Sequence, residues 1–189
     1  MFKRFVWIMF LLLIMSACTS EKKLDTRKLE VAEEDVNILY KPVDKKKAEV
    51  VLPYEIEYPT YFPFEHEETN VAIVGWEDSN EKIVTSIRYP SIEEDDRWNE
   101  GSIYQPAIPN VNYTVANFDR YYSEYADMNG YDEIKIGDDI TGLFKLNKEI
   151  SGAELHWFDG KIEYNLQIMY YSEDTKELED ELIKIANSI

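Results

Sequence analysis

Few side chains in this 189-residue chain suit covalent or metal chemistry: one cysteine, Cys18, and two histidines, His66 and His156. A single cysteine excludes an intrachain disulfide and a zinc site made of several cysteines. The histidines lie too far apart in the sequence for an HExxH motif, and no GxSxG nucleophile motif is present. We therefore expect no catalytic residues, no metal site and no cofactor, in a protein that is not an enzyme.

Each histidine has a structural and a chemical interpretation. His156 is expected on the outer face of a strand opposite Glu163, as a cross-strand pair, whereas a catalytic role would require a nucleophile beside it. His66 lies in an acidic segment, 65–68 (EHEE). A surface position is the expectation for His66, and weak binding of a divalent cation is the alternative.

Carboxylates and tyrosines are abundant, so their proximity alone predicts little. The densest acidic run, 93–96 (EEDD), lacks the alternating ligands and central glycine of an EF-hand loop, and we expect a solvated loop there. Asp138 and Asp139 indicate a turn rather than an acid–base pair. Four tyrosines suit either ordinary packing or contacts with a sugar or peptide: Tyr121, Tyr122, Tyr125 and Tyr131.

The N-terminus has the three parts of an export signal. Lys3 and Arg4 are positive, and residues 5–15 form an apolar run too short to cross a hydrocarbon core of ~30 Å as a helix. The segment 15–18 (MSAC) resembles the lipobox of bacterial lipoproteins. By that resemblance, residues 1–17 are a signal peptide, and Cys18 receives a diacylglycerol through a thioether and becomes the mature N-terminus. A plain cleaved leader and an uncleaved anchor are the alternatives.

Charge divides the rest of the chain into two parts. Residues 19–49 hold 8 basic and 8 acidic side chains, whereas residues 50–189 hold 10 basic and 30 acidic ones. We expect 18–49 to be the lipidated cysteine and a polar tether that spans on the order of 30 Å if flexible. Residues 50–189 are expected to be one extracytoplasmic domain. Four cations would face anionic lipid head groups: Lys22, Lys23, Arg27 and Lys28.

Short β-rich segments dominate the expected domain. Alternation between two prolines predicts an edge strand over 54–58, and the runs 71–76 and 83–89 predict a hairpin. Apolar and aromatic spacing favours a helix over 113–128, with a strand as the alternative. Further short strands are expected over 102–108, 134–136 and 142–146.

The C-terminal 36 residues carry the clearest structural signals. Asp159-Gly160 predicts a two-residue hairpin turn, which would pair Phe158 with Lys161, Trp157 with Ile162, His156 with Glu163 and Leu155 with Tyr164. Asp174, followed by Glu177, predicts the start of a helix. Its apolar stripe should pack on the apolar face of the hairpin: Leu178, Leu182, Ile185, Ala186 and Ile189.

Several short motifs together resemble a family of uncharacterised extracytoplasmic domains of Gram-positive bacteria. They are 58–63 (YPTYFP), 87–89 (IRY), 155–157 (LHW), Tyr164 and 185–189 (IANSI). Domains of that family occur alone in lipoproteins or behind membrane segments of the anti-sigma-factor type. The resemblance covers residues 50–189 and implies no established activity. It implies an α+β fold with an antiparallel sheet, related to the curved half-barrels of lipoprotein carriers.

Together these signals predict an α+β domain with an antiparallel sheet and a C-terminal helix on one face. The expected function is non-catalytic: a lipoprotein on the extracytoplasmic face of the cell membrane that binds a partner or ligand of the envelope or regulates it. The alternative is a carrier of an apolar or lipid ligand, in a cavity lined by Trp76, Trp157 and Tyr164. A carboxylate-dependent hydrolase is a third hypothesis. The acidic composition argues against nucleic acid as a partner.

Overall fold

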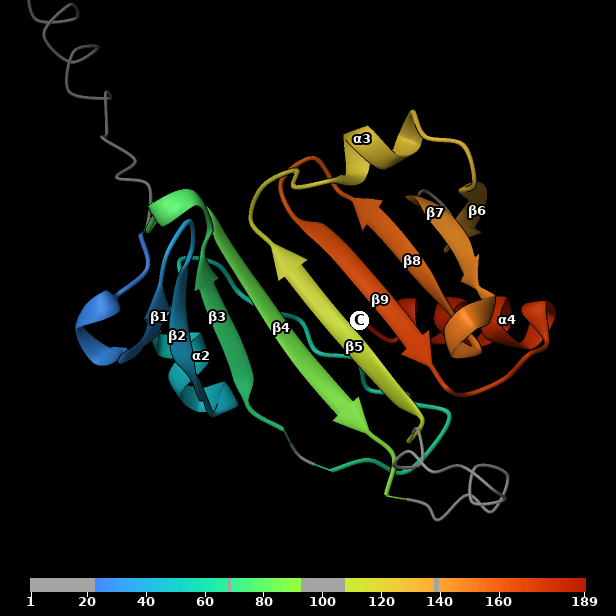
Figure 1. Ribbon diagram of the computed structural model, residues 1–189, viewed down its shortest axis with the longest axis horizontal. Helices are drawn as coiled ribbons and strands as arrows, with labels where there is room; N and C mark the ends of the chain where they lie inside the picture. Colours follow the sequence, from blue (N-terminus) through green and yellow to red (C-terminus); the bar gives the residue numbers. More distant parts are fainter. Residues whose placement is uncertain (1–22, 68, 93–107, 138–139) are drawn as a thin grey trace, which may run out of the picture.

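The protein is built on one antiparallel sheet, seen face-on in Figure 1. The computed structural model describes residues 23–67, 69–92, 108–137 and 140–189, which contain nine strands in the order β1-β2-β3-β4-β5-β9-β8-β7-β6. Two meanders, β1 to β5 and β6 to β9, meet where β5 pairs with β9. In chain order the strands are β1 (Val31–Glu34), β2 (Ile38–Val43), β3 (Val71–Gly75), β4 (Ile83–Pro90), β5 (Asn110–Ala116), β6 (Asp132–Ile136), β7 (Ile140–Asn147), β8 (Gly152–Phe158) and β9 (Glu163–Met169).

One face of the sheet, which we call the covered face, carries the hydrophobic core. Alternate strand positions point to it, and their side chains are fully buried, as in Ile73, Ile87 and Leu166. The helices α2 (Lys45–Val51) and α4 (Thr175–Ala186) lie behind the sheet in Figure 1 and close this face. The remaining α-helix of the described residues, α3 (Tyr122–Ala126), lies at the upper end of the sheet in the same view. The opposite side of the sheet is called the open face below.

The predicted C-terminal helix is confirmed as α4. The carboxylate of Asp174 accepts hydrogen bonds from the N–H groups of Lys176 and Glu177 and so satisfies two free donors of the first turn. The apolar stripe packs against β8 and β9. Three of its side chains are completely buried: Leu178, Leu182 and Ile185.

The segment expected as an edge strand, 54–58, is not a strand in the structure. It belongs to an irregular stretch that crosses behind the sheet between α2 and α4 (Figure 1). Prolines interrupt this stretch and remove N–H donors that a strand would need. It is held by its buried side chains Ile56 and Phe64 and by Tyr113, whose hydroxyl donates to the carbonyl oxygen of Glu57 at 2.9 Å.

The predicted polar tether is wrong for residues 23–49, which belong to the fold. β2 pairs with β3, and β1 extends the sheet by one more strand. Tyr40 and Val43 on β2 and Ala48 on α2 are buried in the core. A strand near the edge of a sheet can form from a few alternating apolar residues among many charged ones, because only one side of such a strand is buried. The domain therefore starts well before residue 50.

Two other local predictions are wrong, and both concern strand pairing. The helix expected over 113–128 is instead the end of β5, followed after a loop by the five-residue α3, because β5 lies between β4 and β9 and alternates between the faces. The hairpin of β8 and β9 pairs Phe158 with Glu163 rather than with Lys161. The carboxylate of Asp159 accepts from the N–H groups of Lys161 and Ile162, which closes a four-residue loop.

The hairpin over 71–89 and the strands over 134–136 and 142–146 are confirmed as β3–β4 and β6–β7. The acidic run 93–96, Asp138 and Asp139 and most of the strand expected over 102–108 lie outside the described residues.

Candidate functional site on the open face

The open face carries rows of polar side chains across its central strands. Alternate positions of β5 (NVNYTVA) and β9 (EYNLQIM) send valine, leucine and isoleucine to the covered face and amides and hydroxyls to the open one. Because the strands are paired in register, these polar groups align from strand to strand. One row is Ser86, Thr114, Asn165 and His156, and the next is Arg88, Asn112, Gln167, Glu154 and Lys145.

A compact hydrogen-bonded cluster lies where these rows cross β8. Tyr131 donates its hydroxyl to Oε1 of Glu154 at 2.8 Å, and Gln167 donates its Nε2 to Oε2 at 3.1 Å. Nε2 of His156 lies 3.4 Å from the same Oε2 and 2.8 Å from Nδ2 of Asn165. His156 is 3% exposed, and its Nδ1 has no hydrogen-bond partner among the residues that the structure describes.

This cluster holds Glu154 in its ionised form. Burial opposes the negative charge, but the neighbouring His156 side chain and the hydrogen bonds from Tyr131 and Gln167 outweigh burial and lower the pKa of Glu154 to about 2. The pKa of Tyr131 is raised, first by burial and then by its hydrogen bond to the Glu154 carboxylate. Glu154 is therefore a fixed negative charge at neutral pH, and Tyr131 a fixed hydroxyl donor.

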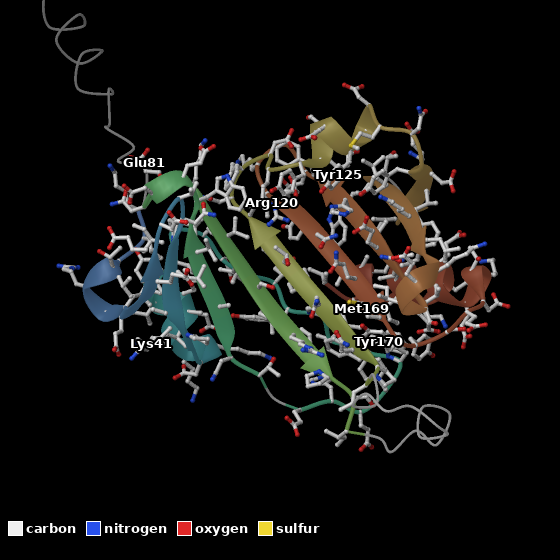
Figure 2. The ribbon with its side chains drawn as sticks, viewed as in Figure 1. Lys41, Glu81, Arg120, Tyr125, Met169 and Tyr170 are labelled. Atoms are coloured by element: carbon white, nitrogen blue, oxygen red, sulfur yellow. The ribbon has the colours of Figure 1, made fainter. Side chains whose placement is uncertain are left out.

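A stack of tyrosine rings lies over this cluster at the upper end of the sheet. The ring centroids of Tyr121 and Tyr125 are 5.5 Å apart and those of Tyr125 and Tyr131 are 5.0 Å apart, with nearly parallel planes. Both Tyr125 and Tyr131 meet the His156 ring at 83°. The guanidinium of Arg120 lies over Tyr121, and Lys145 lies over Tyr131. A cation occupies the outer ring face at each end of the stack, so the stack mainly attaches the segment between β5 and β6, which contains α3, to the sheet. Figure 2 labels Arg120 and Tyr125 in this region.

Glu163 fixes the segment that leads into α3. Its side chain is 1% exposed, and Oε2 accepts hydrogen bonds from three successive N–H groups, those of Arg120, Tyr121 and Tyr122, at 2.6, 2.7 and 3.1 Å. The guanidinium Nε of Arg120 lies 3.8 Å from the other oxygen. A buried carboxylate needs such partners, since an unpaired charge in the interior is costly.

The three aromatic residues expected to line one cavity do not come together. Trp157 and Tyr164 are direct partners in β8 and β9, stack at 5.0 Å between centroids and face the core. Trp76 follows β3, which is separated from β8 by β4, β5 and β9, and it contacts Phe118 and Tyr121. Trp157 and Tyr164 share a face because they lie on paired strands, whereas nothing in the sequence indicated where the strand before Trp76 lies relative to β8.

The two histidines occupy different surroundings. His66 packs edge-on against Phe62 and Tyr89, and its Nδ1 is 2.8 Å from the carbonyl oxygen of Glu67. His156 lies on the face away from α4, as expected, but opposite Asn165 rather than Glu163. Among the described residues, no three His, Cys, Asp or Glu side chains form a group able to hold a metal.

The described side chains of the open face offer hydrogen-bond donors and acceptors. The side chains of Arg88 and Asn112 make no hydrogen bond or ion pair with any part of the chain that the structure describes, and Arg88 is exposed. Sequence reasoning missed this surface, although a signal was present: polar residues alternate with apolar ones in 110–115 and again in 163–168. Two such strands side by side predict one polar face.

Comparison with known proteins found no matching family, no similar curated protein and no similar solved structure. The family resemblance drawn from the sequence therefore stays a prediction. No helix within the described ranges has the length and apolar character to span a membrane. The fold and the site define, for the described residues, a single-sheet α+β protein with a packed core on one face and rows of polar side chains on the other.

Proposed function

We propose that the protein is a non-catalytic binding protein, anchored through lipid on Cys18 to the extracytoplasmic face of the cell membrane, and that the open face binds its ligand. One observation carries the binding role. Within the described residues, no helix lies across the centre of the open face, and this face bears hydrogen-bonding groups on Arg88 and Asn112 that have no partner in the described chain. Such polar groups favour a polar ligand, because an apolar one would leave them unsatisfied.

Anchoring would hold the domain close to the bilayer. The described fold begins at Lys23, five residues after Cys18. Five residues reach at most ~18 Å even when fully extended. A ligand of the open face would therefore bind near the membrane surface.

Anchoring is tested by replacing Cys18 with Ser in the full-length protein and fractionating cells that express it. The wild-type protein should sediment with membranes and incorporate labelled acyl chains. Cys18→Ser should lose the acyl label and leave the membrane fraction or accumulate as an unprocessed precursor. An unchanged distribution and acyl labelling of Cys18→Ser would refute lipid anchoring.

Binding at the open face is tested by a photo-crosslinking amino acid at Asn112 in the intact protein in its own membranes. Position 49, where Glu49 is exposed on α2 behind the sheet, serves as the matched control. A discrete adduct should form from position 112 and disappear when Arg88 is also replaced by Ala. Equal labelling from both positions, or none from position 112, would contradict the assignment of this face.

A further inference from the structure

A hollow of about 670 Å³ opens beside the edge strand β1, away from the open face. Ile38 and Tyr40 of β2 lie in its wall, and carboxylates of Glu34, Asp78 and Glu81 surround it. Figure 2 labels Glu81 at this end of the molecule, close to where the described chain begins. The volume falls within the range of small-ligand sites.

Tyr40 is a polar side chain without a partner in this hollow. Its residue is 4% exposed and lines the hollow, yet its hydroxyl makes no hydrogen bond within the described ranges. Burial, followed by the charges of Asp78 and Glu34, raises the pKa of the Tyr40 phenol. The phenol is therefore neutral at physiological pH and lies in the field of both carboxylates.

The carboxylates around the hollow are not all neutralised. Lys23 pairs with Glu81 at 2.5 Å. Glu34 and Asp78, in contrast, form no ion pair with any described residue. The hollow thus combines two carboxylates without an ion-pair partner in the described chain, the phenol of Tyr40 and the apolar side chains of Val31 and Ile38.

We propose that this hollow binds a lysine-type alkylammonium group. An ammonium ion is attracted by carboxylates and can donate a hydrogen bond to the phenol oxygen of Tyr40. The methylenes of a lysine stem would lie along Val31 and Ile38, since such stems cover apolar surface while the charge stays among polar groups. The length of that stem favours a lysine side chain over the two-carbon ethanolamine of a lipid head group. This site is separate from the open face and does not depend on the function proposed for it.

The test is calorimetric titration of the full chain in nonionic detergent with Nα-acetyl-lysine methylamide. The norleucine analogue, which has nearly the same stem without the charge, is the ligand control. The lysine probe should bind, the norleucine probe should not, and added salt should weaken the binding. Equal binding of both probes, or no binding of the lysine probe, would overturn the proposal.

Two variants of β1 locate the site. Glu34→Gln should weaken binding of the lysine probe by up to about fivefold, the upper range of one exposed ion pair. Glu33→Gln changes the same charge on the same strand but at the position paired with Leu39, away from the hollow, and should leave affinity unchanged. Tyr40→Phe, which keeps the ring, should weaken binding less than Glu34→Gln.

Equal losses of affinity for the lysine probe in Glu33→Gln and Glu34→Gln would show that binding depends only on the net charge of the protein and would refute the site. Vesicles provide the last arm. Tighter binding of the chain to vesicles containing phosphatidylethanolamine than to vesicles of phosphatidylcholine alone, with the difference lost in Glu34→Gln, would assign the hollow to lipid and refute the lysine assignment. Circular dichroism melting of each variant verifies that it is folded.

Discussion

The carboxylate of Glu163 accepts a hydrogen bond from the main-chain N–H of Tyr121 at 2.7 Å, with almost no exposure to solvent. The N–H groups of Arg120 and Tyr122 bind the same oxygen. A single acid on β9 thus fixes the beginning of the loop that carries α3 and the tyrosine stack. The position of the tyrosine stack over His156 therefore depends on this contact.

Replacing Glu163 with Gln should destabilise the protein by about 2–3 kcal/mol, because hydrogen bonds to a charged acceptor are lost in the interior. The measurement is urea unfolding at pH 7 followed by circular dichroism. Glu124→Gln, at an exposed position of α3, is the control and should change stability by less than about 0.5 kcal/mol. Similar midpoints for the two variants would show that the Glu163 contacts contribute little.

Glu154 should make stability depend on pH in the acid range. Its pKa is lowered to about 2 in the folded chain from an ordinary value of 4.5. Because the folded chain binds the proton less readily than the unfolded one, the stabilisation is complete above pH 4.5 and is lost as the pH falls toward 2. Allowing for partial solvent screening, we expect a loss of about 1–2 kcal/mol.

Urea unfolding of wild-type protein and Glu154→Gln at pH 7, 4 and 3 separates this effect from the titration of other acids. The difference in stability between the two proteins should shrink as the pH is lowered. A difference that stays constant across these pH values would contradict the role given to the Glu154 charge.

Asp159→Ala should cost about 1 kcal/mol, since two N–H groups of the β8–β9 loop lose their acceptor. Asp159→Asn retains a side-chain oxygen and should lose less. Thermal unfolding of both variants, compared with Lys161→Ala at an exposed position of the same loop, provides the measurement. If Asp159→Ala melts with the wild type, the loop is closed by its backbone alone.

Truncation distinguishes a folded N-terminal segment from a tether. A chain beginning at Lys23 should unfold cooperatively, whereas one beginning at residue 50 lacks β1, β2 and most of α2 and should not fold. Removing buried Tyr40 and Val43 uncovers core surface, and each buried side chain of that size contributes about 1.5–3 kcal/mol, against a total stability of ~5–15 kcal/mol. Well-dispersed amide resonances from the shorter chain would show that 23–49 is dispensable.

Sequence reasoning succeeded where one short segment contains the whole signal. The capping Asp174 and the apolar stripe of α4 are both local, as is the alternation within β3 and β4. The antiparallel α+β fold with its C-terminal helix follows from those elements. Local signals were sufficient because each of these elements buries one face, whichever strands lie beside it.

Sequence reasoning failed where pairing with a distant strand determines the local structure. Tyr113 and Val115 fit a helix or a strand equally well, and only pairing with β4 and β9 selects the strand. The side chain of Asp159 shifts the hairpin register by two residues, which preserves the faces but replaces Glu163 by Asn165 opposite His156. The contact of Tyr131 with Glu154 joins separate segments of the chain, and no single segment contains it.

The junction of β5 with β9 also determines when folding can be completed. β9 is the last strand of the chain, and it pairs with a strand from the first meander, Ala116 with Glu163 and Asn110 with Met169. The two halves of the sheet cannot join until nearly the whole chain has emerged, and such distant contacts slow folding. If the chain is exported as proposed, the central pairing can close only after residues 163–169 have crossed the membrane.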